Sequence, residues 1–230
     1  MPASRMLMAA MMSVVAVPLI AQPPEIPRWT LSVTAGPGFG GPVGQLRDRM
    51  LEEQWTDRYC DNKLTECHDS PNVRRLSLQV SGALGRRLTD RLELKTVFEV
   101  GDLGEVAGAK GQYTMRASWK TTTLGAALVL RPVRGVRIGG GPIIAMLTRL
   151  ALPTESPNPI RAGLFVEGGL RSSERTASFL ELNVSYRMLP RVPEGPWPGH
   201  AASSQVYAGP TGIDANFSHL TVGLGAGVRF

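Results

Sequence analysis

The sequence lacks a long apolar run after its first 21 residues, and this absence excludes a membrane-spanning helix. Such a helix needs about 20 consecutive apolar residues, and nothing comparable occurs from residue 22 onward. Histidine and cysteine are also scarce, with three and two residues in a chain of 230. We find no nucleophile elbow, phosphate-binding loop or zinc motif. We therefore expect no catalytic site, no cofactor and no metal.

The N-terminus has the anatomy of a secretory signal peptide. Arg5 is the one cation ahead of an uninterrupted apolar segment, residues 6–20, and Ala21 offers a small residue near a cleavage point. An uncleaved anchor is the alternative, but the segment is shorter than the about 20 residues that span a bilayer. No cysteine follows it directly, which argues against a lipoprotein anchor. We predict a signal peptide over residues 1–21 and one exported domain over residues 22–230.

The end of the chain alternates strictly between apolar and other residues. Odd positions from 221 to 229 are Thr, Gly or Arg, and the even positions are apolar: Leu220, Val222, Leu224, Ala226, Val228 and Phe230. A period of two predicts a β-strand with one apolar face.

The same alternation recurs along the chain and predicts eight strands. They cover residues 29–35, 75–85, 92–101, 113–130, 136–147, 161–170, 178–188 and 217–230. In the fourth strand, Met115 and Trp119 have the opposite parity to Leu124 and Leu128, so we expect a bulge at 121–123 to bring all four to the lipid face. Longer connections, 36–73, 102–112, 148–159 and 189–215, alternate with tight turns.

An exported chain that crosses lipid without helices must form a closed barrel, because every backbone N–H and C=O needs an internal partner. An even strand number with alternating short turns and long loops is typical of such barrels, with the short turns in the periplasm. We predict an all-β fold, an eight-stranded antiparallel up-and-down transmembrane β-barrel.

The signal peptide, the alternating strands and the C-terminal pattern resemble the small outer-membrane β-barrel proteins of the OmpA-transmembrane and OmpX type. The resemblance implies the bacterial outer membrane as the location. It also implies that an alternating last strand ending on an aromatic residue is the signal read by the barrel-insertion machinery. On that basis the assembly signal comprises Leu220, Val222, Leu224, Val228 and Phe230.

The opposite face of the predicted strands carries charged residues that would point into the barrel. The predicted interior network comprises Glu93, Lys95, Glu99, Glu167, Glu181 and Arg187. A soluble lipocalin-like barrel would have an apolar interior, so these charges favour a membrane barrel. We expect Glu167 and Glu181 to lie close together, with Lys95 and Arg187 as their cations. A charge-balanced, closed interior is favoured over a gate or a proton-linked pair, because unpaired buried charge is costly.

Two cysteines, Cys60 and Cys67, lie in the first long loop, and in an exported chain such a pair predicts a disulfide. The alternative is a metal site with His68, which lacks a fourth ligand at suitable spacing. In the same loop, Leu46, Met50 and Trp55 can line one side of a short helix on the barrel mouth or at the lipid interface, or belong to a solvated turn.

These features favour a non-enzymatic outer-membrane protein with a structural or surface-interaction role. The net charge of +6 and the pI near 9.8 are explained by basic loops near anionic lipid rather than by nucleic acid. The expected partners are outer-membrane lipid, lipopolysaccharide and the insertion machinery, and we expect a monomer. The alternatives are a lipid A-modifying deacylase or acyltransferase and a narrow conduit for small apolar solutes. The enzyme is disfavoured because Ser218 and His219 point to opposite faces of one strand.

Overall fold

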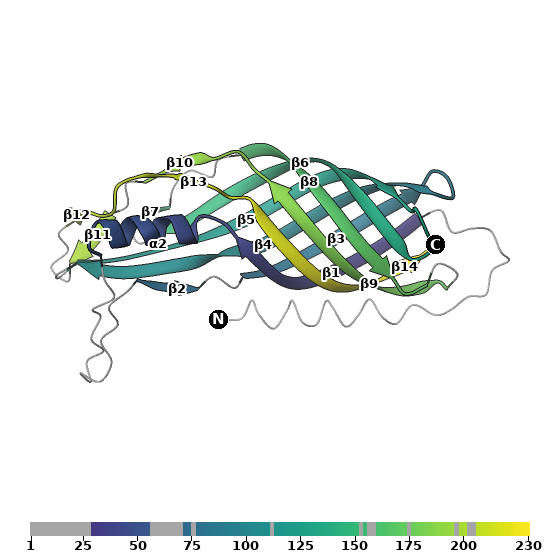
Figure 1. Cartoon of the computed structure of the whole chain (residues 1–230), viewed down its shortest axis with the longest axis horizontal. Helices are drawn as coiled ribbons and strands as arrows, with labels where there is room; N and C mark the ends of the chain where they lie inside the picture. The colour runs from purple at the N-terminus through teal and green to yellow at the C-terminus, as the bar shows by residue number, and fades with distance from the viewer. Residues whose placement is uncertain are drawn as a thin grey trace, which may run out of the picture.

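The computed structural model describes residues 29–55, 71–74, 77–110, 113–151, 154–155, 160–173, 176–195, 198–201 and 206–230. Eight long strands form the body of the protein (Figure 1). They are β1 (Trp29–Gly40), β3 (Ser77–Arg87), β4 (Leu92–Lys110), β5 (Tyr113–Leu130), β6 (Val136–Ala151), β8 (Ile160–Arg171), β9 (Ser178–Met188) and β14 (His219–Arg229). The described helix is not long and apolar enough to cross a membrane.

The eight strands close into a ring. Each pairs antiparallel with its neighbours in the order β1, β3, β4, β5, β6, β8, β9, β14, and β14 returns to β1. At the seam, Trp29 and Phe230 exchange two backbone hydrogen bonds of 3.0 and 3.1 Å. Closure pairs the edge strands, which is the condition for placing a sheet in lipid. The predicted fold class is confirmed.

The outer surface of the ring is apolar. Side chains of alternate residues on every strand of the ring point outward and are exposed, and we call them the apolar belt. Among its members are Leu31, Leu84, Leu94, Phe98, Leu124, Leu128, Ile138, Ile144, Leu164, Val166, Leu180, Leu182, Val184 and Leu224. Exposed apolar side chains in continuous rows on a closed barrel require a lipid environment.

The two ends of the barrel differ. Three tight connections and the C-terminus lie at one end, the turn end. The described residues of these connections are 88–91, 131–135, 172–173 and 176–177. The other end, the loop end, carries α2 (Val43–Glu52) and six short strands: β2 (Asn72–Arg74), β7 (Thr154–Glu155), β10 (Val192–Glu194), β11 (Pro198–Ala201), β12 (Val206–Ala208) and β13 (Ile213–Ala215). In Figure 1 the loop end is at the left and the turn end at the right.

Helix α2 closes the loop end. Val43, Leu46 and Met50 recur at helical spacing and are at most 2% exposed, and Trp55 after the helix is 1% exposed. They belong to a loop-end plug whose other members are Leu103, Val106, Met115, Ala117, Trp119, Leu147, Leu189, Val192, Ala215 and Phe217. The helix predicted in this loop therefore exists, and it packs on the barrel mouth.

Polar contacts fasten α2 to the segment that precedes β14. The Gln45 side-chain amide donates to the Asp214 carbonyl at 3.1 Å and accepts from the Asn216 N–H at 2.7 Å. Beyond the helix, the Glu53 carboxylate accepts from the Thr211 N–H at 3.0 Å. The start of the connection after β1 is thus held to the end of the connection that leads into β14, over the mouth of the barrel.

The bulge predicted in the fourth strand is wrong. Strand β5 alternates without interruption, and Met115 and Trp119 are 4% and 1% exposed inside the plug. The register shift lies in β4, between Asp102 and Glu105. Gly104 there has a φ of +99°, and a Cβ on it would lie 2.5 Å from the Arg74 carbonyl oxygen, so this turn of the backbone requires glycine. Met115 and Trp119 lie beyond the apolar belt, on the side of the loop end. Their side chains therefore pack inward against the plug rather than outward against lipid.

Candidate functional site

The charged interior of the barrel is the candidate site. Strand alternation sends every second residue inward, and in the half of the ring nearest the turn end several of these buried residues are charged. Four carboxylates lie inside the ring, each at most 8% exposed: Glu93, Glu99, Glu167 and Glu181. Each contacts at least one cation from another strand.

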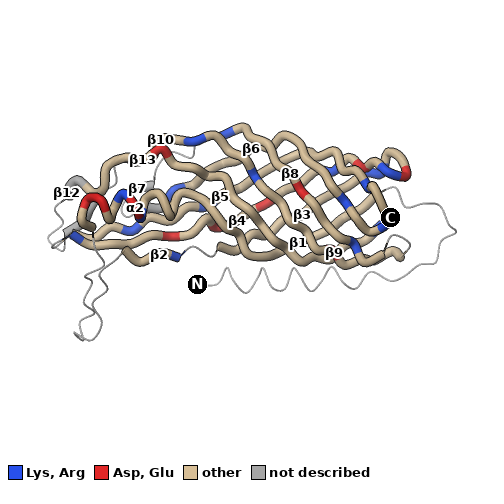
Figure 2. Tube along the Cα trace, viewed as in Figure 1, with Lys and Arg blue, Asp and Glu red and all other residues tan. Residues whose placement is uncertain are grey.

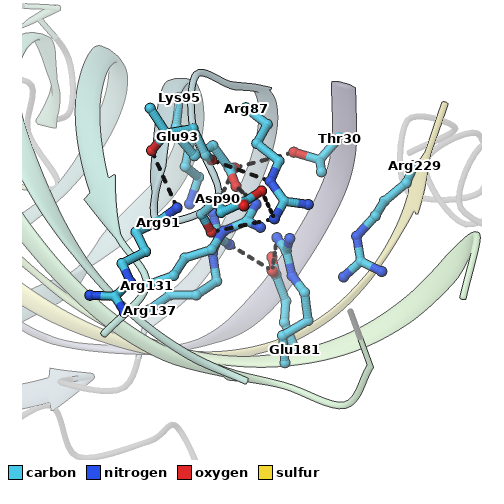
Figure 3. A network of polar contacts seen from close by, with 12 residues as sticks. Thr30, Arg87, Asp90, Arg91, Glu93, Lys95, Arg131, Arg137, Glu181 and Arg229 are labelled. Carbon is cyan, nitrogen blue, oxygen red and sulfur yellow. Dashed lines mark hydrogen bonds and ion pairs between the residues drawn. The ribbon is translucent and has the colours of Figure 1, made fainter. Parts of the chain in front are cut away.

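The ion-pair network closest to the turn end joins two carboxylates through arginines. Glu93 accepts from Arg131 and, at 2.7 Å, from Nη2 of Arg137. Glu181 accepts from Nη1 of Arg137 at 3.3 Å and from Arg171 at 3.0 Å. Arg137 therefore bridges β4 and β9 from its place on β6, and Figure 3 shows it between the two carboxylates.

A lysine–glutamate pair lies next to this network, on the side away from the turn end. The Lys95 ammonium donates to both Glu167 oxygens at 2.8 Å, and the two side chains are 5% and 7% exposed. The Asn183 amide lies 3.4 Å from the same carboxylate. A cavity of about 10 Å³, the room needed for one water molecule, lies beside the pair. The expectation that Lys95 neutralises one of the two hairpin carboxylates agrees with this contact.

The expectation for Arg187 is wrong. Arg187 donates to Glu99 at 2.5 Å, on the far side of the lumen, and contacts neither Glu167 nor Glu181. His219 completes this group: Nε2 lies 3.5 Å from Glu99, and Nδ1 lies 3.0 Å from the Phe217 carbonyl oxygen. Arg187 lies six residues beyond Glu181 on β9 and is therefore further from the turn end. The carboxylate at its own depth is on β4.

The predicted interior network left out four of its described members: Arg131, Arg137, Arg171 and His219. Arg131 and Arg171 occupy strand ends, where we read them as turn residues. Their odd numbers match the inward parity of Val129 and Glu167, and this signal could have identified them. The parity of His219 was noted, but no pattern indicated that Glu99 faces it.

The remaining predicted residues are those of the assembly signal and the two cysteines. In the assembly signal, Leu224 and Phe230 are 71% and 64% exposed on the outer surface, and Leu220, Val222 and Val228 are partly buried. Cys60 and Cys67 lie outside the described residues, so the disulfide stays a prediction.

Ser218 and His219 make separate sets of contacts. Within the described residues, the hydrogen bonds of the Ser218 hydroxyl go to the backbone of Leu189: it accepts from the N–H at 3.1 Å and lies 3.3 Å from the carbonyl oxygen. The His219 ring points into the lumen toward Glu99. In this arrangement the imidazole does not contact the hydroxyl, which a serine nucleophile would require.

A further buried carboxylate lies at the loop end, outside the apolar belt. Glu194 on β10 is 7% exposed and accepts from Arg149 at 3.1 Å. Burial raises the pKa of Glu194 above the ordinary value of a glutamate, although Arg149 acts in the opposite direction. The pair attaches the small sheet of β10 and β13 to β6.

The closed ring, the apolar belt and the polar interior define the class of protein: a small eight-stranded β-barrel with the architecture of outer-membrane proteins. No protein-family model matches the sequence, and no curated protein matches it. Among solved structures, the chain is similar to Ail of Yersinia pestis, with 12% identity over 90% of this chain and 100% of that one and a TM-score of 0.43.

Two further structures have comparable similarity. Neisserial surface protein A has 11% identity over 88% of this chain and 96% of its own, with a TM-score of 0.43. OprG of Pseudomonas aeruginosa has 11% identity over 89% and 98%, with a TM-score of 0.46. By name, the first of these two is a surface protein and the second an outer-membrane protein. At these scores the fold rests on the strand pairing of the chain itself.

Proposed function

We propose that this protein is a non-enzymatic protein of the bacterial outer membrane, a closed barrel with a structural or surface-interaction role. In this proposal residues 1–21 direct export, and the alternating last strand guides the insertion machinery. The turn end faces the periplasm and the loop end faces outward, where it meets lipopolysaccharide and external partners. The protein acts as a monomer, because its ring is complete within one chain.

One observation carries the proposal: side chains fill the interior of a ring whose outside is apolar. Ion pairs cross the lumen at three depths, through Glu93, Glu167 and Glu99, and the plug covers the mouth above them. Eight strands leave an interior that side chains can fill without leaving an aqueous channel. Such a barrel offers its external end, rather than its lumen, for interaction.

The packing of the loop end supports a surface role. The strands β4, β5 and β6 continue past the belt, their inward side chains belong to the plug, and β4 packs against α2. This part of the chain is therefore an ordered platform with a buried core. A protein that only filled space in the membrane would not need an apolar core above the belt.

The test uses the mature chain refolded into lipid bilayers. Heat-modifiable migration and a β-type circular dichroism spectrum establish that the barrel has assembled. Planar-bilayer conductance should then show no steady current, and lipopolysaccharide incubated with the protein should keep its mass. Steady conductance would favour the conduit, and loss or transfer of an acyl chain would favour the enzyme. Mass spectrometry of the protein from cell envelopes should place its N-terminus close to residue 22.

A further inference from the structure

All three tight connections at the turn end are rich in arginine. Counted with the strand ends beside them, as residues 86–91, 131–135 and 171–177, they contain seven arginines and two acids, Asp90 and Glu174. Figure 2 shows basic positions gathered near the C-terminus. Solubility does not require arginine at these positions, because acidic residues would serve that purpose at least equally well.

The described arginines of these connections fall into two groups. Arg131 and Arg171 are buried and hold the interior carboxylates, and Arg87 contacts Asp90 at 3.0 Å. The second group is Arg86, Arg91 and Arg134, which we call the rim arginines. They are exposed, and among the described residues no carboxylate lies within ion-pair distance of them.

Each rim arginine lies beside exposed apolar side chains. Arg86 is on the outward face of β3, paired in register with Trp29 and with Leu94, which is 47% exposed. Its guanidinium lies 5.5 Å from the centre of the Trp29 ring, a cation–π contact.

The other two rim arginines have the same kind of setting. Arg91 shares its turn with Leu88, which is 49% exposed, and Arg134 follows Val133, which is 61% exposed. A cation next to apolar side chains at the edge of a membrane-facing surface lies at the depth of the lipid head groups.

We infer that the rim arginines bind the phosphate groups of anionic phospholipids in the leaflet next to the turn end. A guanidinium presents a planar fork that matches phosphate oxygens. In the described part of the chain, no carboxylate occupies that fork in Arg86, Arg91 or Arg134. Trp29 anchors the acyl-chain side of the head group while Arg86 meets the phosphate. The inference rests on the proposed function, since it needs the barrel in a bilayer.

A lipid explains the geometry better than a soluble acidic partner does. Arg86 faces sideways from the barrel wall, between the belt residue Leu84 and the turn, and Trp29 beside it is 38% exposed. A periplasmic protein or polymer would approach the end of the barrel instead. Arg91 and Arg134 are exposed there on the turns, but Arg131 and Arg171 are buried in the interior network and Arg86 lies on the wall.

The experiment measures which lipids the barrel retains at its surface. The mature chain is refolded in phosphatidylcholine bilayers that contain trace spin-labelled phosphatidylglycerol or spin-labelled phosphatidylcholine. We expect phosphatidylglycerol to be retained at least about twofold more strongly than phosphatidylcholine. One basic residue near an anionic surface increases binding about fivefold, and the measured signal averages this effect over all lipids that contact the barrel. The preference should fall as salt is raised.

The test variant is the triple substitution Arg86→Gln, Arg91→Gln, Arg134→Gln, and it should retain the two lipids equally. The matched control removes three exposed cations at the loop end, Arg116→Gln, Lys120→Gln and Arg191→Gln, and should keep the preference.

Three outcomes would overturn the inference: no preference in the native protein, a preference that survives the rim variant, or an equal loss in the control. Soluble polyglutamate that abolishes the preference at constant ionic strength would assign the rim to an acidic macromolecule instead. Heat-modifiable migration of every sample separates these outcomes from failure of the proposed function. A chain that does not insert contradicts the barrel, whereas an inserted barrel without lipid preference contradicts the rim site alone.

Discussion

Replacing Lys95 with methionine tests whether the interior charges hold the barrel together. The ammonium lies 2.8 Å from both Glu167 oxygens, in a pair whose side chains are 5% and 7% exposed. The substitution keeps most of the side-chain volume and leaves the carboxylate with the Asn183 amide at 3.4 Å. Removing one partner of a buried pair costs about 3–5 kcal/mol.

The assay is urea unfolding of the refolded protein in bilayers or detergent. With m-values of about 1–3 kcal/mol per molar urea, the midpoint should fall by at least about 1 M. The double variant Lys95→Met, Glu167→Leu should recover most of the loss, because a buried pair replaced by apolar residues is often neutral. Lys120→Met, at an exposed position on β5, is the control and should change stability by less than about 0.5 kcal/mol.

Two results would refute the reasoning. A native midpoint for Lys95→Met would mean that water already solvates Glu167, so that the pair contributes nothing. A double variant as unstable as the single one would mean that packing at this position, and not the unpaired charge, sets the loss. In either case the bilayer conductance of the same samples shows whether the lumen is an open aqueous path; we expect none, since eight strands are too few for one.

Three further predictions concern the seam, the first loop and the loop end. Deleting Phe230 removes its backbone bonds to Trp29 and the last residue of the assembly signal; heat-modifiable protein in outer-membrane fractions should be lost, and normal assembly would contradict the role given to this residue. Non-reducing peptide mapping of the exported protein should join Cys60 to Cys67, and free thiols at both would revive the metal alternative. Because burial raises the pKa of Glu194, its contribution to stability is largest below the unfolded pKa and falls as pH rises through the folded value. The native protein should therefore gain stability relative to Glu194→Gln as pH drops from 7 toward 4.5, and an unchanged difference would show that the carboxyl is solvated.

The sequence by itself determined the strands that face lipid. Where one side of a strand meets hydrocarbon, the period of two is imposed by the environment, and β5 (Tyr113–Leu130) and β9 (Ser178–Met188) have the predicted ends. The prediction failed where the lipid ends. Strands β4 and β6 extend to Lys110 and Ala151, past the predicted residues 101 and 147, because pairing continues where outward alternation stops.

Only the tertiary structure decided which charges meet. Alternation places Glu93, Lys95, Glu99 and Arg187 inside, but the partner of each is chosen by strand tilt and stagger around the ring, and these are properties of the closed barrel. The same holds for Met115 and Trp119. Their parity is local, whereas the plug that buries them is formed by α2 and the segment before β14, which lie far away in the sequence. A periodic environment leaves its period in the sequence, but contacts across a lumen leave no such pattern, because each depends on the depth at which two distant strands come to lie.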